Sequence, residues 1–555
     1  MRNAGKAWGG VRAAAFAVLA ATPVIASSAT DLVPVRSGVR SQPIATLTSG
    51  SAGLPCLTGT VQSLRLERQK GTASQRRALM ALANEPALFG ERTVLDTEGI
   101  SIRFTADRNS ADRVEPADDN ANGRPDAVDD ALAGVARAQQ LLVGQLELPS
   151  PGGIDIVLSR LGSGVDGVSI PGAVRQARSR VWLDPSARGG VRRAAEHQYA
   201  HTVAAAAGLN PFWSEAFATW TVIALEGAPD ERTLSSIAGR LAADGAGLVT
   251  QDLEIASGNA AWFTFLNDAY GPTMVKLAVE ELGRGGSDQA ALDRATRRAT
   301  GDPLDAALRN YHVWSILVGP RDDHRHFAFA GHLPAQAVAA TADAFPVLSV
   351  QTEPEIGPMG QAAILLHPDE VGGGMTIRFE GDLAARWAAD VLIVHTGGEL
   401  RRVGMTLDGE DSGEISIPLQ DVREMLLLVR NLDSEGHPAR RYTWGAQVDA
   451  RFPTEFGSVR AEAAQGGNGA LVSWETTTER GLLGFNVLRS AADRTESTRV
   501  NPVWIPAVGE TSGPAAYSFF DAGTEPGVSY RYRIEAVTLE GLASRSDAAA
   551  LTPAP

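Results

Sequence analysis

The chain has 555 residues, with 50 Lys and Arg against 65 Asp and Glu, which gives a formal net charge of −15. This acidic balance excludes the basic face of a nucleic-acid-binding protein, and a hydrophobic fraction of 44% excludes a fully disordered chain. The single cysteine, Cys56, excludes an intramolecular disulfide framework. At about 150 residues per domain, this length predicts about three or four domains.

Residues 1–29 predict a secretory signal peptide. Lys6 and Arg12 supply the positive region, Ala13–Ala26 is an apolar stretch too short to span a membrane comfortably, and small residues up to Ala29 suit cleavage. The alternative is an uncleaved membrane anchor. No later stretch is apolar over about 18 residues. We therefore expect a secreted protein, extracellular or periplasmic, with no membrane span in its mature chain.

Residues 30–94 contain many Ser, Gly and Pro residues and one helix-like run, 74–84, which predicts a pro-region or linker. The sequence does not decide whether this segment is removed. Residues 95–338 predict a mixed α/β unit that is mostly helical, with strands at 100–104, 154–158 and 180–183 and late helices at 288–298 and 303–314. We expect the strand at 180–183 to be an edge strand that lines a cleft.

The segment Asp118–Asp129 has the spacing of an EF-hand calcium loop, with Gly123 at the sharp turn and Pro125 before a helix. The predicted oxygen ligands are Asp118, Asn120, Asn122, Arg124 (by its backbone carbonyl), Asp126 and Asp129. Asp129 is shorter than the usual Glu at the last position. Bound Ca²⁺ would tie the helix start to the preceding strand, and the alternative is an Asx-rich capping turn with no metal.

A pair of histidines, His197 and His201, has the i, i+4 spacing that places both imidazoles on one helical face, within reach of one metal ion. Glu215 follows on a second predicted helix rich in large aromatic residues. Two His and one Glu with an open fourth position form the zinc arrangement of a hydrolytic site. These residues therefore predict a Zn²⁺ centre.

On these motifs the chain resembles a family of bacterial secreted zinc metallopeptidases of the gluzincin type. The family shows a DxNxNGxPDxVE-like loop, an HExxH helix and a WxEAxATW helix, which match residues 118–129, 197–201 and 213–220 here; residues 258–271 also fit. The resemblance covers about residues 56–450. It implies an α+β gluzincin-like metallopeptidase domain with His197, His201 and Glu215 as zinc ligands.

The chain departs from the family at the residue after the first histidine, where Gln198 replaces the Glu that acts as general base. An amide cannot accept a proton from zinc-bound water, and loss of a general base costs about 10²- to 10⁴-fold in rate. Glu196 is the less favoured substitute. It lies about 120° from the mean direction of the two histidines, against about 80° for Gln198. We expect zinc to be retained and peptidase activity to be weak or absent, unless Glu196 or another carboxylate restores it.

Several other polar residues are weaker candidates. The oxyanion-stabilising residue of a gluzincin is a Tyr or His, and Tyr270, Tyr311 and His312 all remain open as that residue. His324 and His326 follow two aspartates, which indicates a solvated turn more than a metal site.

Beyond residue 338 the chain predicts two all-β sandwich domains. Residues 339–452 contain short strands separated by Gly and Asp turns, and Phe452-Pro453 marks a boundary. Residues 456–555 contain an early Trp474 strand and a late strand with Tyr530 and Tyr532 on one face, and resemble a fibronectin type III domain.

The sequence thus predicts an exported, zinc-binding metallopeptidase-like protein that binds a peptide or protein in its cleft. It is either a weak peptidase or an inactive pseudopeptidase. The alternative is a non-catalytic extracellular adhesion or binding protein, in which the β-sandwich and fibronectin-like domains engage a surface or protein partner. The substrate and the oligomeric state are not given by the sequence.

Overall fold

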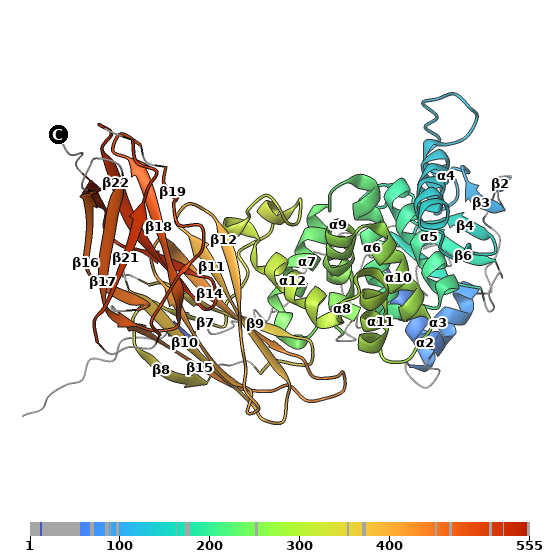
Figure 1. Ribbon diagram of the computed structural model, residues 1–555. Helices are drawn as coiled ribbons and strands as arrows, with labels where there is room; N and C mark the ends of the chain where they lie inside the picture. The colour runs from blue at the N-terminus through green and yellow to red at the C-terminus, as the bar shows by residue number, and fades with distance from the viewer. Residues whose placement is uncertain are drawn as a thin grey trace, which may run out of the picture. The chain divides into compact units, whose positions relative to one another are not determined.

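The computed structural model describes residues 12–13, 56–66, 72–83 and 88–551, with gaps at 89, 96–98, 163, 173–177, 250–252, 352–354, 369–372, 450–451, 465–468, 495, 510–512 and 526. The chain divides into two compact units, 18–336 with 434–436, and 1–17 with 337–433 and 437–555. The first is mostly helical and the second is built from strands (Figure 1). The predicted signal peptide lies almost wholly outside the described residues.

The helical unit contains a five-stranded mixed sheet in the order β2-β3-β4-β6-β5. The strands are β2 (Glu91–Leu95), β3 (Ile100–Thr105), β4 (Ile154–Leu158), β6 (Ser179–Leu183) and β5 (Gly167–Ile170). The pairs β3–β4 and β4–β6 are parallel, whereas the outer strands β2 and β5 are antiparallel to their neighbours. The strand at 180–183 is therefore interior; the edge strands of this sheet are β2 and β5, and β5 is the one that lies against α5. The sequence does not reveal β5 as an edge strand because all four of its residues are buried. It therefore lacks the alternation of apolar and polar residues that is typical of a half-exposed strand.

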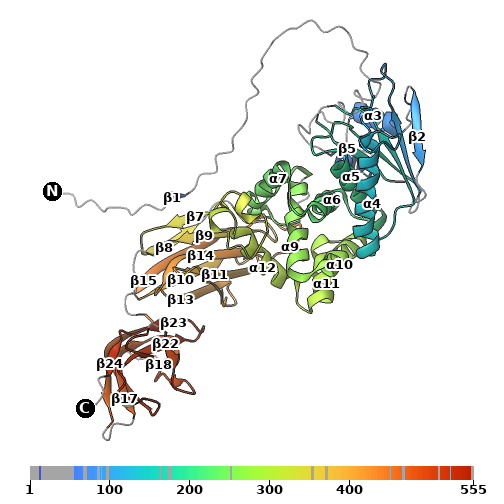
Figure 2. The same ribbon diagram turned by 90° about the horizontal axis from the view of Figure 1, so that it is seen from above.

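Two long helices carry the predicted zinc ligands, α5 (Val191–Ala207) and α6 (Pro211–Glu226). Helix α5 lies beside α4 (Asp126–Gln139) in both views (Figures 1 and 2). A Cβ at Gly134 of α4 would lie 2.3 Å from the Arg192 carbonyl oxygen, so only glycine permits this close approach. The close packing fixes the rotation of α5 and hence the direction of its histidines.

The remaining helices complete this unit, and most of them follow α6 in the chain. They are α2 (Thr58–Leu66), α3 (Ala73–Ala83), η1 (Gln140–Gln145), α7 (Glu231–Ala242), η2 (Asp244–Ala246), α8 (Leu253–Ala256), η3 (Ser257–Asn259), α9 (Ala260–Tyr270), α10 (Pro272–Gly283), α11 (Asp288–Thr300), α12 (Leu304–Ile316), η4 (Gly319–Arg321) and η5 (Ala330–His332).

Part of the segment predicted as a pro-region or linker is built into the helical unit. Leu57 and Val61 are fully buried and share an apolar cluster with Val157 of β4 and Trp182 of β6. Strand β2, which begins within 30–94 and ends at Leu95, pairs with β3. The Ser, Gly and Pro content concealed this because the contacts that order residues 56–66 come from strands about a hundred positions later.

The second unit begins with a β-sandwich. One sheet has the order β1-β7-β9-β14-β11-β12 and the other β13-β10-β15-β8. Residues of both sheets, such as Val391 and Trp444, share one apolar core. The strands are β1 (Arg12–Ala13), β7 (Ala340–Ala342), β8 (Val347–Gln351), β9 (Gln361–Leu366), β10 (Gly374–Gly381), β11 (Trp387–His395), β12 (Leu400–Met405), β13 (Ser412–Pro418), β14 (Val422–Asn431) and β15 (Tyr442–Asp449).

A smaller sandwich ends the chain (Figure 2). Its sheets are β16-β17-β21 and β19-β18-β22-β23, with β20 paired to β18 and β24 paired to β22. Trp474 and Tyr532, one from each sheet, lie in the same apolar core. The strands are β16 (Thr454–Ala463), β17 (Ala470–Glu479), β18 (Leu482–Ala491), β19 (Thr498–Arg499), β20 (Ile505–Pro506), β21 (Ala515–Asp521), β22 (Tyr530–Thr538), β23 (Ala543–Arg545) and β24 (Ala549–Leu551).

The architecture confirms the coarse prediction of a multidomain chain with a helical region followed by two sandwich-like β domains. Within the described part of the chain, no helix is both long and apolar enough to cross a bilayer.

Glu281 of α10 generates a prediction about the stability of the helical unit. Its side chain is 1% exposed and binds Arg284, Arg294 and Arg298 at 2.5, 2.8 and 2.6 Å. We expect Glu281→Gln to lower the free energy of unfolding by about 2 kcal/mol in urea titrations, because three guanidinium groups lose their shared buried carboxylate. The matched control Glu280→Gln removes a partly exposed carboxylate 3.7 Å from Arg298 and should cost less than about 0.5 kcal/mol.

The same contribution should depend on pH. Burial raises the pKa of Glu281, but the arginines outweigh burial and lower it below the ordinary value. The stabilisation is therefore present above the pKa of an unfolded glutamate and is lost as the pH falls through the lower folded value. The difference between wild type and Glu281→Gln should shrink in acid, and a constant difference would contradict this account.

Candidate metal centre

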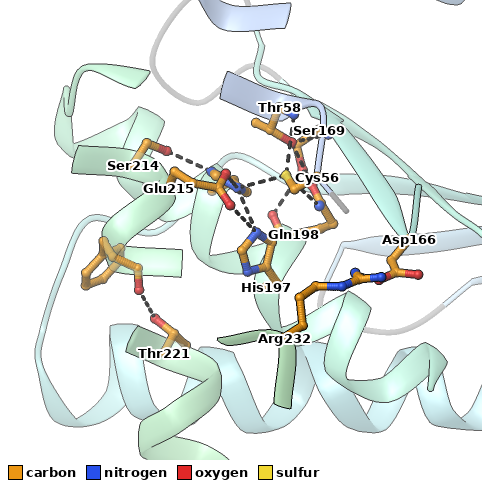
Figure 3. Close-up of polar contacts among 12 residues, drawn as sticks. Cys56, Thr58, Asp166, Ser169, His197, Gln198, Ser214, Glu215, Thr221 and Arg232 are labelled. Atoms are coloured by element: carbon orange, nitrogen blue, oxygen red, sulfur yellow. Dashed lines mark hydrogen bonds and ion pairs between the residues drawn. The ribbon is translucent and has the colours of Figure 1, made fainter. Parts of the chain in front are cut away.

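The two predicted histidine ligands meet on one face of α5. The Nε2 atoms of His197 and His201 lie 3.1 Å apart, and the rings meet edge to face. On its other side, His201 Nδ1 lies 2.8 Å from the hydroxyl of Ser214 on α6 (Figure 3). This contact orients the ring and leaves Nε2 directed toward His197.

Glu215, the predicted third ligand, reaches the same point from α6. Its carboxylate oxygens lie 3.5 Å from His197 Nε2 and 3.2 Å from His201 Nε2. The start of α6 is well fixed, because Asn210 caps it by accepting a hydrogen bond from Trp213 N, and Pro211 opens its first turn. The structure thus brings together all three residues that the sequence selected.

A fourth side chain, Cys56, joins this group, and the sequence analysis missed it. Its Sγ lies 3.3 Å from His201 Nε2, and it receives hydrogen bonds from Gln198 Nε2 at 3.2 Å and Thr58 N at 3.4 Å (Figure 3). One donor atom from each of Cys56, His197, His201 and Glu215 lies within 4.8 Å of all the others. Cys56 is 145 positions from His201, so no local spacing could reveal the contact.

The charges of this cluster depend strongly on one another. Burial raises the pKa of the Cys56 thiol, as does Glu215, but the two imidazoles outweigh both and lower it to about 6. Burial lowers the pKa of His197, yet Glu215 and Cys56 raise it to about 10. Burial raises the pKa of Glu215, but the imidazoles lower it well below its usual range. The thiol and the carboxyl group thus favour the charged form of the imidazoles, and the imidazoles favour the charged form of the thiol and the carboxyl group.

The donor set fits zinc. Thiolate, imidazole and carboxylate are its usual ligands, and bonds of about 2.0–2.3 Å in a tetrahedron place neighbouring donors about 3.3–3.6 Å apart. Four of the separations between these donor atoms are 3.1, 3.2, 3.3 and 3.5 Å. Imidazole binds a metal in its neutral form, so a divalent cation at this point would compete with protonation of the two rings.

Gln198, which follows His197 on α5, is held by hydrogen bonds on both sides of its amide. Its Nε2 donates to Cys56 Sγ, and its Oε1 accepts from Thr58 Oγ1 at 2.9 Å and Ser169 Oγ at 2.6 Å. Gly167 of the edge strand makes room for it, since a Cβ there would lie 2.8 Å from Gln198 Cγ. The amide is therefore packed into the site with its polar atoms engaged.

Glu196, the less favoured substitute base, is directed to a different set of partners. Its side chain is fully buried and binds Arg137 Nη1 of α4 at 2.5 Å, and the same nitrogen binds Glu226 at 2.6 Å. Burial raises the pKa of Glu196 to about 7, against the opposing charge of Arg137. Glu196 therefore joins α4 to α5 and does not face the four donors.

A cavity of about 390 Å³ opens beside the cluster. Cys56, His197, Gln198 and Glu215 contribute to its wall, and His197 and Glu215 keep 16% and 12% of their side chains exposed. Charged residues surround the opening, including an ion pair between Arg232 and Asp166 at 2.8 Å (Figure 3). Any ligand would approach the cluster from this cavity.

The remaining sequence candidates lie elsewhere. Tyr270 accepts a hydrogen bond from Asn310, and Tyr311 packs edge-on against Trp262 beside His312. None of these three oxyanion candidates is among the described residues that line the cavity. His324 and His326 lie 3.1 and 2.7 Å from Asp322 and Asp323 of their own turn, in keeping with a solvated turn.

The predicted calcium loop forms a tight turn before α4. Asn120 Oδ1 and Asn122 Oδ1 each accept a hydrogen bond from the backbone N–H two positions on, as in Asx turns, and Asp118 accepts from the N–H groups of Asn122 and Gly123. Asp129 accepts from both Asn120 Nδ2 and Asn122 Nδ2 and lies 3.0 Å from Arg124 Nε. Calcium binding would require both amides to rotate and the Arg124 side chain to release Asp129. Bound calcium stays a prediction.

Comparisons with known proteins give no family. No protein-family model matches the chain, and no curated protein matches it. Among solved structures, an Fn3-like protein from Clostridium thermocellum is 25% identical, over 19% of this chain and 96% of that chain, with a TM-score of 0.14. A β-1,2-glucanase from Parabacteroides distasonis is 14% identical over 38% and 33% of the two chains, with a TM-score of 0.14.

The adhesin domain of Epf from Streptococcus pyogenes is 10% identical over 37% of this chain and 74% of that chain, with a TM-score of 0.16. These likenesses are too low to support an argument about activity, and none of the three proteins is described as a peptidase.

Gly167 generates the first prediction from this site. We expect Gly167→Ala to destabilise the helical unit by about 1–3 kcal/mol and to displace Gln198 from Cys56, because the added methyl group overlaps the Gln198 side chain. The control Gly239→Ala adds a methyl group inside α7 where nothing lies within 4 Å, and it should be neutral or stabilising by up to about 1 kcal/mol. Urea unfolding checks both variants, and equal effects would contradict the packing argument.

The predicted calcium loop generates a second prediction, which concerns thermal stability. Millimolar Ca²⁺ should raise the melting temperature of the wild-type protein, since a ligand that binds only the folded state stabilises it. Asp118→Asn should abolish this increase, while Asp343→Asn, a change at an aspartate outside the loop, should leave it intact. Equal melting temperatures with and without Ca²⁺ would favour the metal-free capping turn.

Proposed function

We propose that the protein is an exported, zinc-binding, peptidase-like protein that binds a peptide or protein in its cleft and has little or no peptidase activity. The observation that carries this proposal is the convergence of His197, His201 and Glu215 beside a glutamine at the position of the general base. Helix α5 packs against β5 and β6 of the mixed sheet, which supports an α+β domain of the class that the resemblance implies. Export rests on the sequence of residues 1–29.

Zinc bound by these ligands would supply a Lewis acid and a cross-link between α5 and α6. Neither Gln198 nor Glu196 is placed to act as a general base for hydrolysis. Gln198 has no basic atom to accept a proton and its amide is already bonded on both sides. Glu196 binds Arg137 and does not line the cavity among the described residues. Binding, not turnover, is what this arrangement supports.

The cavity suits a peptide because it combines opposite charges with an apolar wall. Arg188 and Arg232 offer guanidinium groups, Asp166 and Glu231 offer carboxylates, and Ala194 adds an apolar surface. The described residues of the two β domains do not indicate a partner, so the predicted binding role of those domains stays a prediction.

The test is metal analysis combined with a protease assay. We expect about one zinc per chain in the purified protein, loss of most of it in His201→Ala, and no measurable casein hydrolysis. His324→Ala is the matched control, since this histidine is 89% exposed in a turn away from the cluster, and it should keep its zinc. Zinc-free wild-type protein would overturn the metal assignment.

Two further outcomes bear on function. Strong casein hydrolysis that disappears in His201→Ala would overturn the absence of activity. Fluorescence anisotropy with labelled casein peptides should show binding to the wild-type protein, and a lack of binding across the peptide pool would overturn the proposed role of the cleft.

A further inference from the structure

We infer that Cys56 is the fourth zinc ligand and that Gln198 is the residue that holds its thiolate, so that the chain's own N-terminal segment closes the metal centre. This inference rests on the proposed function in so far as it assumes zinc at His197, His201 and Glu215. It adds that the zinc has four protein ligands and that none of its coordination positions is left open.

The position of Cys56 is fixed by the fold on both sides of it. The next residue, Leu57, is fully buried in the cluster that contains Trp182, and α2 begins at Thr58. Cys56 also forms a parallel bridge with Gly167 of the edge strand, and Leu57 N donates to the Gly167 carbonyl at 3.4 Å. The sulfur is thus placed beside the histidines by packing and backbone pairing, with 6% of the residue exposed.

The surroundings of the sulfur are those of a metal-bound thiolate. Two N–H groups, from Gln198 and the Thr58 backbone, donate to it. The hydroxyl groups of Thr58 and Ser169 both engage the oxygen of the Gln198 amide, and this turns the amide nitrogen toward Cys56. Such contacts outside the ligand set commonly orient ligands and raise metal affinity.

This geometry explains why an amide replaces the carboxylate of HExxH. A glutamate at position 198 in the same pose would place a carboxylate oxygen at the position of Nε2, 3.2 Å from the sulfur. A carboxylate oxygen has no N–H to donate, so the hydrogen bond that Gln198 gives to the sulfur would be lost. The cysteine and the glutamine are therefore two parts of one arrangement, and the glutamine is a positioning residue for the thiolate.

The position of Cys56 affects the cleft as well as the metal. Structural zinc sites have four protein ligands, whereas catalytic sites keep one position open for water or substrate. Cys56 takes that position, and residues 56–57 pair with the edge strand at Gly167. An extended peptide that added a strand at this point would have to displace the segment. Restoring a glutamate at position 198 therefore does not by itself open the site.

Cobalt substitution of the full-length protein tests the inference without a variant. We expect the cobalt form to show thiolate-to-cobalt charge-transfer absorption, and X-ray absorption of the zinc form to show one sulfur at about 2.3 Å. Because the chain has a single cysteine, either signal identifies Cys56. One bound metal per chain with no sulfur signal would overturn the inference and leave the proposed function standing. A protein that binds no metal would overturn both.

Variants then separate the two residues. Cys56→Ser should bind cobalt through the remaining ligands and lose the charge-transfer band. Gln198→Glu should weaken zinc binding about 10- to 100-fold and speed labelling of the Cys56 thiol. Gln140→Glu, the same change on an exposed residue of η1, should alter neither property. Gln198→Glu protein with wild-type zinc affinity and an unchanged band would overturn the role given to Gln198.

Discussion

The helical unit depends on one electrostatic constraint, the burial of a thiol and a carboxylate beside two imidazoles at the meeting point of α5, α6 and the segment before α2. Buried anionic groups are costly unless positive charge accompanies them. Contacts from neighbouring residues hold these four side chains in place. Ser214 orients His201, Asn210 and Pro211 fix the start of α6, and Gly134 brings α4 against α5.

The surrounding contacts divide the polar residues of α5 between two tasks. Gln198 faces the edge strand and is held by Ser169 and Thr58, whereas Glu196 faces α4 and binds Arg137. Their directions differ because residues two positions apart on a helix point about 200° apart. One helix thus carries both the face with the clustered histidines and an ion pair that joins it to its neighbour.

The sequence predicted what depends on local spacing. The i, i+4 histidines and the strands around Trp474 and Tyr532 have patterns within a few residues, and the structure brings His197, His201 and Glu215 together. It did not predict what depends on distant contacts. Cys56 meets His201 across 145 positions, and β5 is an all-buried strand without alternation. A segment with many loop-forming residues around Cys56 concealed its packing against Val157 and Trp182.

The long separation of Cys56 from the other donors has a consequence for chain entropy. His197, His201 and Glu215 lie within the stretch 197–215, so a metal held by them alone closes only short loops. A metal that also binds Cys56 joins points 145 residues apart. By the chain-entropy relation for cross-links, closing a loop of this length reduces the conformational entropy of the unfolded chain. This raises the free energy of the unfolded chain by about 5 kcal/mol. In a protein that can form no intramolecular disulfide, its one thiol would thus provide a long-range cross-link through a metal ion.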